Sequence, residues 1–199
     1  AAGQPVANPD YQWFVDSGLR QLVLVTAHRR ENWGAPMVEI AQSVARLLEQ
    51  HPEAAVVWPV HLNPLVQQVV RGVHGASSAD VQRRWRLTAP LDYAPMVEIM
   101  DAAQLLLTDS GGIQEEGLSL NKPLLVMRDV TERPEVIACG AGLLVGTEAE
   151  RILSAASHVL ATGQLPGLPP ASVDNPFGDG SSGLQIAAAI ARHLQPSSL

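Results

Sequence analysis

The chain has 199 residues, 46% of them hydrophobic, which suits one ordinary globular domain with a substantial core. Its net charge of -7 argues against nucleic acid or an anionic membrane surface as the main partner. A single cysteine excludes an internal disulfide and a cysteine-based metal cluster, and no apolar run is long enough to cross a bilayer.

No leader-like segment stands at the start of the chain, so we expect a cytoplasmic protein. The first residue is not Met, and the first ten residues have a loop-like composition. We therefore expect the chain to be a piece of a longer protein.

Strands and helices are predicted to alternate along the chain. Continuous apolar runs, typical of strands buried on both faces, fall at residues 22–25, 55–60, 85–88, 105–107, 123–127 and 143–145. Apolar residues at helical spacing predict helices at residues 37–48, 64–73, 96–103, 113–120, 134–140, 148–160 and 183–194. A Pro- and Gly-rich loop at residues 163–174 precedes the last helix. This order predicts an α/β, Rossmann-like three-layer domain with a six-stranded parallel sheet.

In a parallel sheet, ligands bind beyond the carboxyl ends of the strands, so the loops after the strands are the functional candidates. These loops cover residues 26–33, 61–64, 89–95, 108–112 and 128–133. They bring to one rim His28, Arg29, Arg30, His61, Asp109, Ser110, Arg128 and Arg133. A cationic rim on an acidic protein suggests a phosphorylated ligand, and scattered surface arginines are the alternative.

The segment from Leu105 to Glu116 is the most informative stretch. An apolar run ends in turn- and cap-forming residues, and then Gly111 and Gly112 lead into a helix. The N–H groups at such a helix start attract a phosphate, and glycines let the backbone approach it. Glu116, about one and a half turns further on, is placed to accept hydrogen bonds from sugar hydroxyls. A plain Ser-capped helix after a tight turn is the alternative.

Six stretches that follow one another in order carry a resemblance to a known family. They are TAHRREN (26–32), WPVHLNP (58–64), PLDYAPM (90–96), TDSGGIQEE (108–116), NKPLLVMRDVTERPE (121–135) and NPFGDG (175–180). Together they resemble the C-terminal domain of the non-hydrolysing UDP-N-acetylglucosamine 2-epimerases, which have the two-domain GT-B fold. The resemblance runs from about residue 20 to 195, and HRREN, DSGGIQEE and MRDVTERPE are highly specific in combination.

The resemblance implies that residues 1–199 form a single UDP-binding domain, the C-terminal half of a GT-B fold. Ser110, Gly111 and Gly112 would bind the diphosphate through the helix start. Glu116 would take the ribose hydroxyls, and Arg133 would line the site.

Further roles follow from the same resemblance. Met96 stands where the family often has an aromatic residue that stacks on uracil, and Met can still pack softly against a base. His28 matches a histidine near the reacting centre and the diphosphate. Arg29, Arg30 and His61 resemble positions that touch a second, regulatory UDP-sugar in some bacterial members.

The implied reaction is reversible inversion at C2 of UDP-N-acetylglucosamine, which gives UDP-N-acetylmannosamine without a cofactor or metal. UDP is eliminated to leave 2-acetamidoglucal, and it adds back after protonation of the other face. His28 would supply charge or a proton to the departing diphosphate.

The family's proton-moving carboxylates belong to an N-terminal domain that this chain lacks. We expect Asp109, Glu115 and Glu132 to be structural rather than substitutes. The chain alone is therefore predicted to be inactive and to bind UDP weakly, and the full-length protein is expected to be a homodimer.

Three other functions remain open. The chain would also suit the nucleotide-binding domain of a GT-B glycosyltransferase, although nothing in it resembles an acceptor site. A non-catalytic module that binds nucleotide sugars is the second alternative. The third is a hydrolysing epimerase, which would release free N-acetylmannosamine and UDP.

Overall fold

The computed structural model describes residues 8–168 and 175–194 of the chain. Six parallel strands form one sheet in the order β3-β2-β1-β4-β5-β6. The strands are β1 (Gln21–Thr26), β2 (Ala54–Pro59), β3 (Trp85–Thr88), β4 (Leu105–Thr108), β5 (Leu124–Val126) and β6 (Gly142–Leu144). The predicted six-stranded parallel sheet is confirmed, and each predicted strand is present within two residues of its expected bounds.

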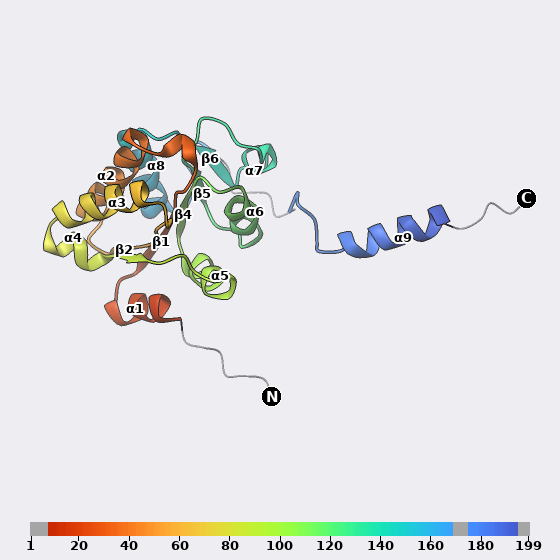
Figure 1. The fold of residues 1–199 in the computed structure, drawn as a ribbon, viewed down its shortest axis with the longest axis horizontal. Helices are drawn as coiled ribbons and strands as arrows, with labels where there is room; N and C mark the ends of the chain where they lie inside the picture. Colours follow the sequence, from red (N-terminus) through yellow and green to blue (C-terminus); the bar gives the residue numbers. More distant parts are fainter. Residues whose placement is uncertain (1–7, 169–174, 195–199) are drawn as a thin grey trace, which may run out of the picture.

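Helices cover both faces of this sheet (Figure 1). One layer contains α2 (Ala35–Gln50), α3 (Pro64–Ala76), α4 (Ala79–Arg84) and α8 (Ala149–Thr162). The other contains α1 (Pro9–Ser17), α5 (Tyr93–Ala102), α6 (Gly111–Ser119) and α7 (Pro134–Ala138). The domain is therefore the Rossmann-like α/β sandwich of three layers that the alternation of elements predicts.

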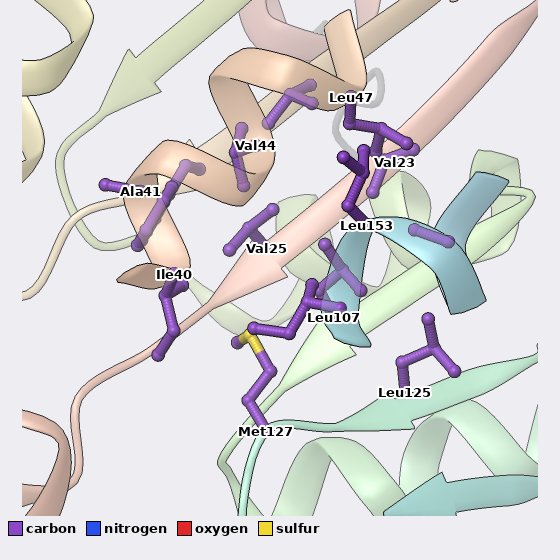
Figure 2. Close-up of a cluster of buried hydrophobic side chains, with 14 of the residues drawn as sticks. Val23, Val25, Ile40, Ala41, Val44, Leu47, Leu107, Leu125, Met127 and Leu153 are labelled. Carbon is purple, nitrogen blue, oxygen red and sulfur yellow. The ribbon is translucent and has the colours of Figure 1, made fainter. Parts of the chain in front are cut away.

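Strand β1 shows how the two cores are separated. Val23 and Val25 point to the layer of α2 and α8, where Figure 2 shows them among side chains of those helices and of β4 and β5. Leu22 and Leu24 belong to the opposite core with α5 and α6. All four are at most 1% exposed, as expected for the central strand of a sheet buried on both faces.

Two helices were missed by the sequence prediction. Residues 9 and 10, assigned to a loop, begin α1, which Asn8 caps by accepting hydrogen bonds from the N–H groups of Asp10 and Tyr11. Ser78 caps α4 by accepting from the N–H of Val81. Both caps are recognisable sequence signals, but the helices that follow have only 9 and 6 residues, too few for apolar periodicity to be recognised.

The last helix, α9 (Ser182–Leu194), is close to its predicted bounds and stands apart from the sheet in Figure 1. None of its residues is buried, and Leu184, Ile190 and Leu194 are each more than half exposed. The predicted loop at 163–174 is described only as far as residue 168. No described helix has the length and apolar character needed to span a membrane.

Candidate functional site

The candidate site lies at the carboxyl ends of β1 and β4, the two central strands. Thr26 and Thr108, their last residues, lie opposite each other, and their hydroxyl oxygens are 2.6 Å apart. The strand order reverses between β1 and β4, so the chain leaves them in opposite directions and opens a crevice there. The residues that follow the two strands meet across this crevice.

Asp109, directly after β4, anchors the loop that follows β1. Its carboxylate is fully buried and accepts hydrogen bonds from the backbone N–H groups of His28 and Arg29, each at 2.9 Å. The Nδ2 of Asn32 donates to the same carboxylate at 3.0 Å, and Nδ1 of His28 lies 3.0 Å from Oδ1. The prediction of a structural role was right but incomplete, because Asp109 also orients His28.

Electrostatics keep Asp109 ionised. Burial alone would raise the pKa of this carboxyl, but the hydrogen bonds from the His28 ring and from backbone N–H groups, with the charge of His28, hold the pKa below its ordinary value. An ionised carboxylate only accepts, so Nδ1 of His28 carries a proton. The other ring nitrogen, Nε2, is then the one left for a ligand.

The start of α6 has the predicted capped geometry. Ser110 is the N-cap, and its side chain accepts from the N–H of Ile113 at 3.5 Å. The helix begins at Gly111, two residues earlier than predicted, so both glycines lie in its first turn. The N–H groups of Gly111 and Gly112 have no carbonyl partner within the helix and are available to an anion.

Two guanidinium groups lie beside this helix start. A Cβ on Gly111 would lie 3.8 Å from Nη2 of Arg29 and 3.8 Å from both Cζ and Nη2 of Arg133. The Nε–H of Arg29 is buried and has no hydrogen-bond partner among the described residues. First-turn amides and two arginines thus converge on one small region, which is suited to a diphosphate.

Ion pairs hold the loop between β5 and α7 against this region. Arg128, only 5% exposed, donates to Glu31 at 2.7 Å and to Glu132 at 3.1 Å, and Arg29 lies 3.4 Å from Glu132. Hydrogen bonds from Arg128 lower the pKa of Glu132 to about 2. Nε of Arg133 pairs with the carboxylate of Glu115, so Glu115 and Glu132 both neutralise arginines.

A cavity of about 240 Å³ adjoins the helix start and is lined by His28, His61, Met96 and Ser110. The His28 and His61 rings are stacked, with centroids 6.1 Å apart. Nδ1 of His61 accepts from the N–H of Asn63 at 3.1 Å, so its Nε2 carries the proton in the neutral ring. The structure thus gathers four predicted site residues around one hollow.

Glu116 lines a second cavity, of about 300 Å³, together with Tyr93, Val97 and Phe177. Helices α5 and α6 contribute residues to both cavities, but His28 lines only the first. Burial, and secondarily the charge of Glu115, raises the pKa of Glu116. A ligand that reaches both His28 and Glu116 has to extend along the start of α6.

The three residues predicted for a regulatory ligand have different contacts. Arg29 lies beside Gly111 and His61 lines the first cavity, whereas Arg30 is exposed and its Cζ lies 5.9 Å from the centroid of the Trp33 ring. A separate regulatory site on these three residues remains a prediction. In the described ranges, no group of three or more His, Cys, Asp or Glu side chains is arranged to hold a metal ion.

Comparison with known proteins points to one family. A family model described as UDP-N-acetylglucosamine 2-epimerase matches residues 8–191. UDP-N-acetylglucosamine 2-epimerase of Yersinia pestis is 41% identical over 184 residues, which cover 90% of this chain and 46% of that protein.

Solved structures agree in fold. A UDP-N-acetylglucosamine 2-epimerase of Neisseria meningitidis, bound to UDP-GlcNAc, superposes with a TM-score of 0.79 at 32% identity, covering 94% of this chain and 50% of that one. The structure from Listeria monocytogenes, described as a putative enzyme of the same name, gives a TM-score of 0.80 at 33% identity, covering 98% of this chain and 50% of that one. The chain therefore spans about half the length of the relatives it matches. Sequence and fold together place the chain in the UDP-N-acetylglucosamine 2-epimerase family.

Proposed function

We propose that this chain is the UDP-binding half of an enzyme that interconverts UDP-N-acetylglucosamine and UDP-N-acetylmannosamine without hydrolysis. The observation that carries the proposal is the convergence of Arg29 and Arg133 on Gly111, at the first turn of α6. Family membership favours this activity over that of a glycosyltransferase or a non-catalytic binding module.

The domain's part in the reaction would be to hold UDP while it leaves and returns. Elimination breaks the C1–O bond and removes the C2 proton, so negative charge grows on the departing diphosphate. The amides of Gly111 and Gly112, the two guanidinium groups and the Nε2–H of a His28 imidazolium would stabilise that charge. Each such donor is worth about 3 kcal/mol in comparable sites. Met96 would pack against uracil, and Glu116 would accept from the ribose hydroxyls.

The proton transfers at C2 need carboxylates that are not already paired. Asp109, Glu115 and Glu132 each hold a histidine or an arginine in this structure. We therefore propose that the C2 acid and base come from an N-terminal domain outside this chain. Helix α9, with its apolar side chains exposed, would pack on that domain, and the full-length protein would pair into a homodimer.

Calorimetric titration of the chain with UDP and with uridine tests the binding half of the proposal. UDP should bind weakly but more tightly than uridine, and replacing Arg29 and Arg133 with Ala should reduce that difference in affinity. Arg20→Ala is a matched control, because Arg20 is exposed and paired with Glu53 on another part of the surface. Unchanged UDP binding in the double variant would contradict the proposal.

Activity needs the full-length protein. Incubated with UDP-N-acetylglucosamine and no acceptor, it should form UDP-N-acetylmannosamine, whereas the present chain should form none. Release of free N-acetylmannosamine would indicate a hydrolysing enzyme instead. Epimerisation by this chain alone at a normal rate would disprove the assignment of the C2 chemistry to another domain.

A further inference from the structure

Gln114, one turn into α6, has a fully buried side chain. A buried amide is tolerated only when its ends are hydrogen-bonded, and both ends of this one are. Its Nε2 donates to the carbonyl oxygen of Ser110 at 3.2 Å, and its Oε1 accepts from the Thr131 hydroxyl at 2.6 Å. The amide therefore bridges the cap of α6 and the loop between β5 and α7.

The same Thr131 hydroxyl continues the chain of hydrogen bonds to Arg133. Its oxygen accepts from the backbone N–H of Arg133 at 3.1 Å, so its own hydrogen is the one given to Gln114. That direction agrees with the orientation of the amide, whose NH₂ faces a carbonyl. The backbone of Arg133 is thereby fixed relative to the first turn of α6.

The side chain of Arg133 starts from this fixed backbone and reaches the edge of Gly111. It has two further contacts: Nη1 donates to the Glu132 carbonyl at 3.1 Å, and Nε pairs with Glu115. Both partners of the Glu115 pair are more than a third exposed, so salt screens their attraction. The link from Gln114 to Thr131 is uncharged and partly shielded, and it keeps its strength in salt.

We infer that Gln114 and Thr131 are positioning residues that hold Arg133 beside Gly111, so that the anion site is formed before a ligand arrives. This inference rests on the proposed function, because the anion in question is the diphosphate of UDP. Neither residue touches the ligand in this scheme. The effect of Thr131 should therefore pass entirely through Arg133, whereas Gln114 also contacts the Ser110 carbonyl at the cap of α6.

The test measures dissociation constants of UDP and uridine for the chain carrying Thr131→Val, Thr131→Ser or Gln114→Leu. Thr131→Val and Gln114→Leu should raise the dissociation constant of UDP about tenfold and that of uridine less than about twofold, since only UDP carries the diphosphate. Thr131→Ser, which keeps the hydroxyl, should restore the affinity. Thr88→Val is the matched control, because the Thr88 hydroxyl donates only to the carbonyl of Ala89.

A double-variant cycle separates positioning from a general loss of structure. In an Arg133→Ala background, Thr131→Val should change UDP affinity less than about twofold. The inference fails if Thr131→Val weakens UDP binding equally with and without Arg133. It also fails if the substitution weakens uridine binding as much as UDP binding, or if it changes the affinity for neither ligand. Failure of the unaltered chain to bind UDP would overturn the proposed function as well, and so is a distinct outcome.

Discussion

Asp109 and His28 are joined across the carboxyl ends of β4 and β1, with Nδ1 of His28 3.0 Å from Oδ1 of Asp109. The backbone N–H of His28 donates to the same carboxylate, so both the ring and the chain of His28 are held by one buried group. This pair links the two halves of the sheet where their order reverses, and it orients a ring that lines the first cavity.

Asp109→Asn should lower the free energy of unfolding by about 2–3 kcal/mol at pH 7, because an amide brings hydrogens toward donors that need an acceptor. Urea denaturation measures the loss. The pKa of Asp109 is lowered in the folded chain, so its stabilisation is complete above the ordinary carboxyl pKa of about 3.9. The stabilisation is lost as pH falls through the lowered value, so the free energies of unfolding of the two proteins should begin to converge as pH falls below about 4.

Asp101→Asn is the control for this pH dependence. Asp101 is 70% exposed and lies 3.7 Å from Lys122, and such surface pairs contribute little to stability. Its replacement should leave the unfolding curve nearly unchanged across the same pH range. The assigned role would be contradicted if the original protein and Asp109→Asn differed by a constant free energy of unfolding down to pH 2.

Two helical glycines should respond oppositely to Ala. At Gly117, a Cβ would lie 2.5 Å from Leu106 Cδ1 and 2.9 Å from Leu124 Cδ2, both in the packed core. Gly117→Ala should therefore destabilise the fold by about 1–3 kcal/mol through overpacking. Gly72→Ala meets no atom within 4 Å and should stabilise α3 by about 0.5–1 kcal/mol. Thermal denaturation of both variants checks this contrast. Equal shifts of the melting temperature in the same direction would refute it.

Arg84 is predicted to be a structural cation. It is 8% exposed and pairs with Asp80 at 2.6 Å. It also donates to three backbone carbonyls, those of Leu48, His51 and Ala54. Arg84→Met should cost about 2–4 kcal/mol, because those carbonyls lose their donor. Arg83→Met is the control, since Arg83 contacts the same aspartate at 2.9 Å from an exposed position. Similar losses for both arginines would show that the carbonyl contacts do not matter.

Deletion of residues 182–199 should leave the rest of the domain intact. Helix α9 buries none of its side chains, so its removal takes no apolar area out of the core. We expect the melting temperature to move by less than about 2 °C while the helical circular dichroism falls. A drop of more than about 5 °C would show that α9 packs on this domain in solution.

Local sequence signals were sufficient for most of the architecture. Runs such as 105–107 are apolar throughout because their strands are buried on both faces, and Asn63 and Ser110 are cap residues because their side chains satisfy N–H groups at a helix start. The same kind of signal stands at Asn8 and Ser78, but the short helices that follow were missed because they are too short for apolar periodicity to be recognised. The strand–glycine–helix segment likewise predicted the capped start of α6, beside which Arg29 and Arg133 lie.

Local sequence signals could not predict which distant residues are in contact. His28 and Asp109 are 81 positions apart, and no spacing rule connects them or brings Arg29 and Arg133 to the same glycine. They meet because β1 and β4 pair in parallel register, with Thr26 opposite Thr108, which places both loops at one edge of the sheet. The sequence by itself therefore determined the elements and the residue types at the site, since these depend on local propensity and burial pattern. Only the tertiary structure decided which side chains share a partner, because that depends on strand order and on the hydrogen bonds that close the crevice.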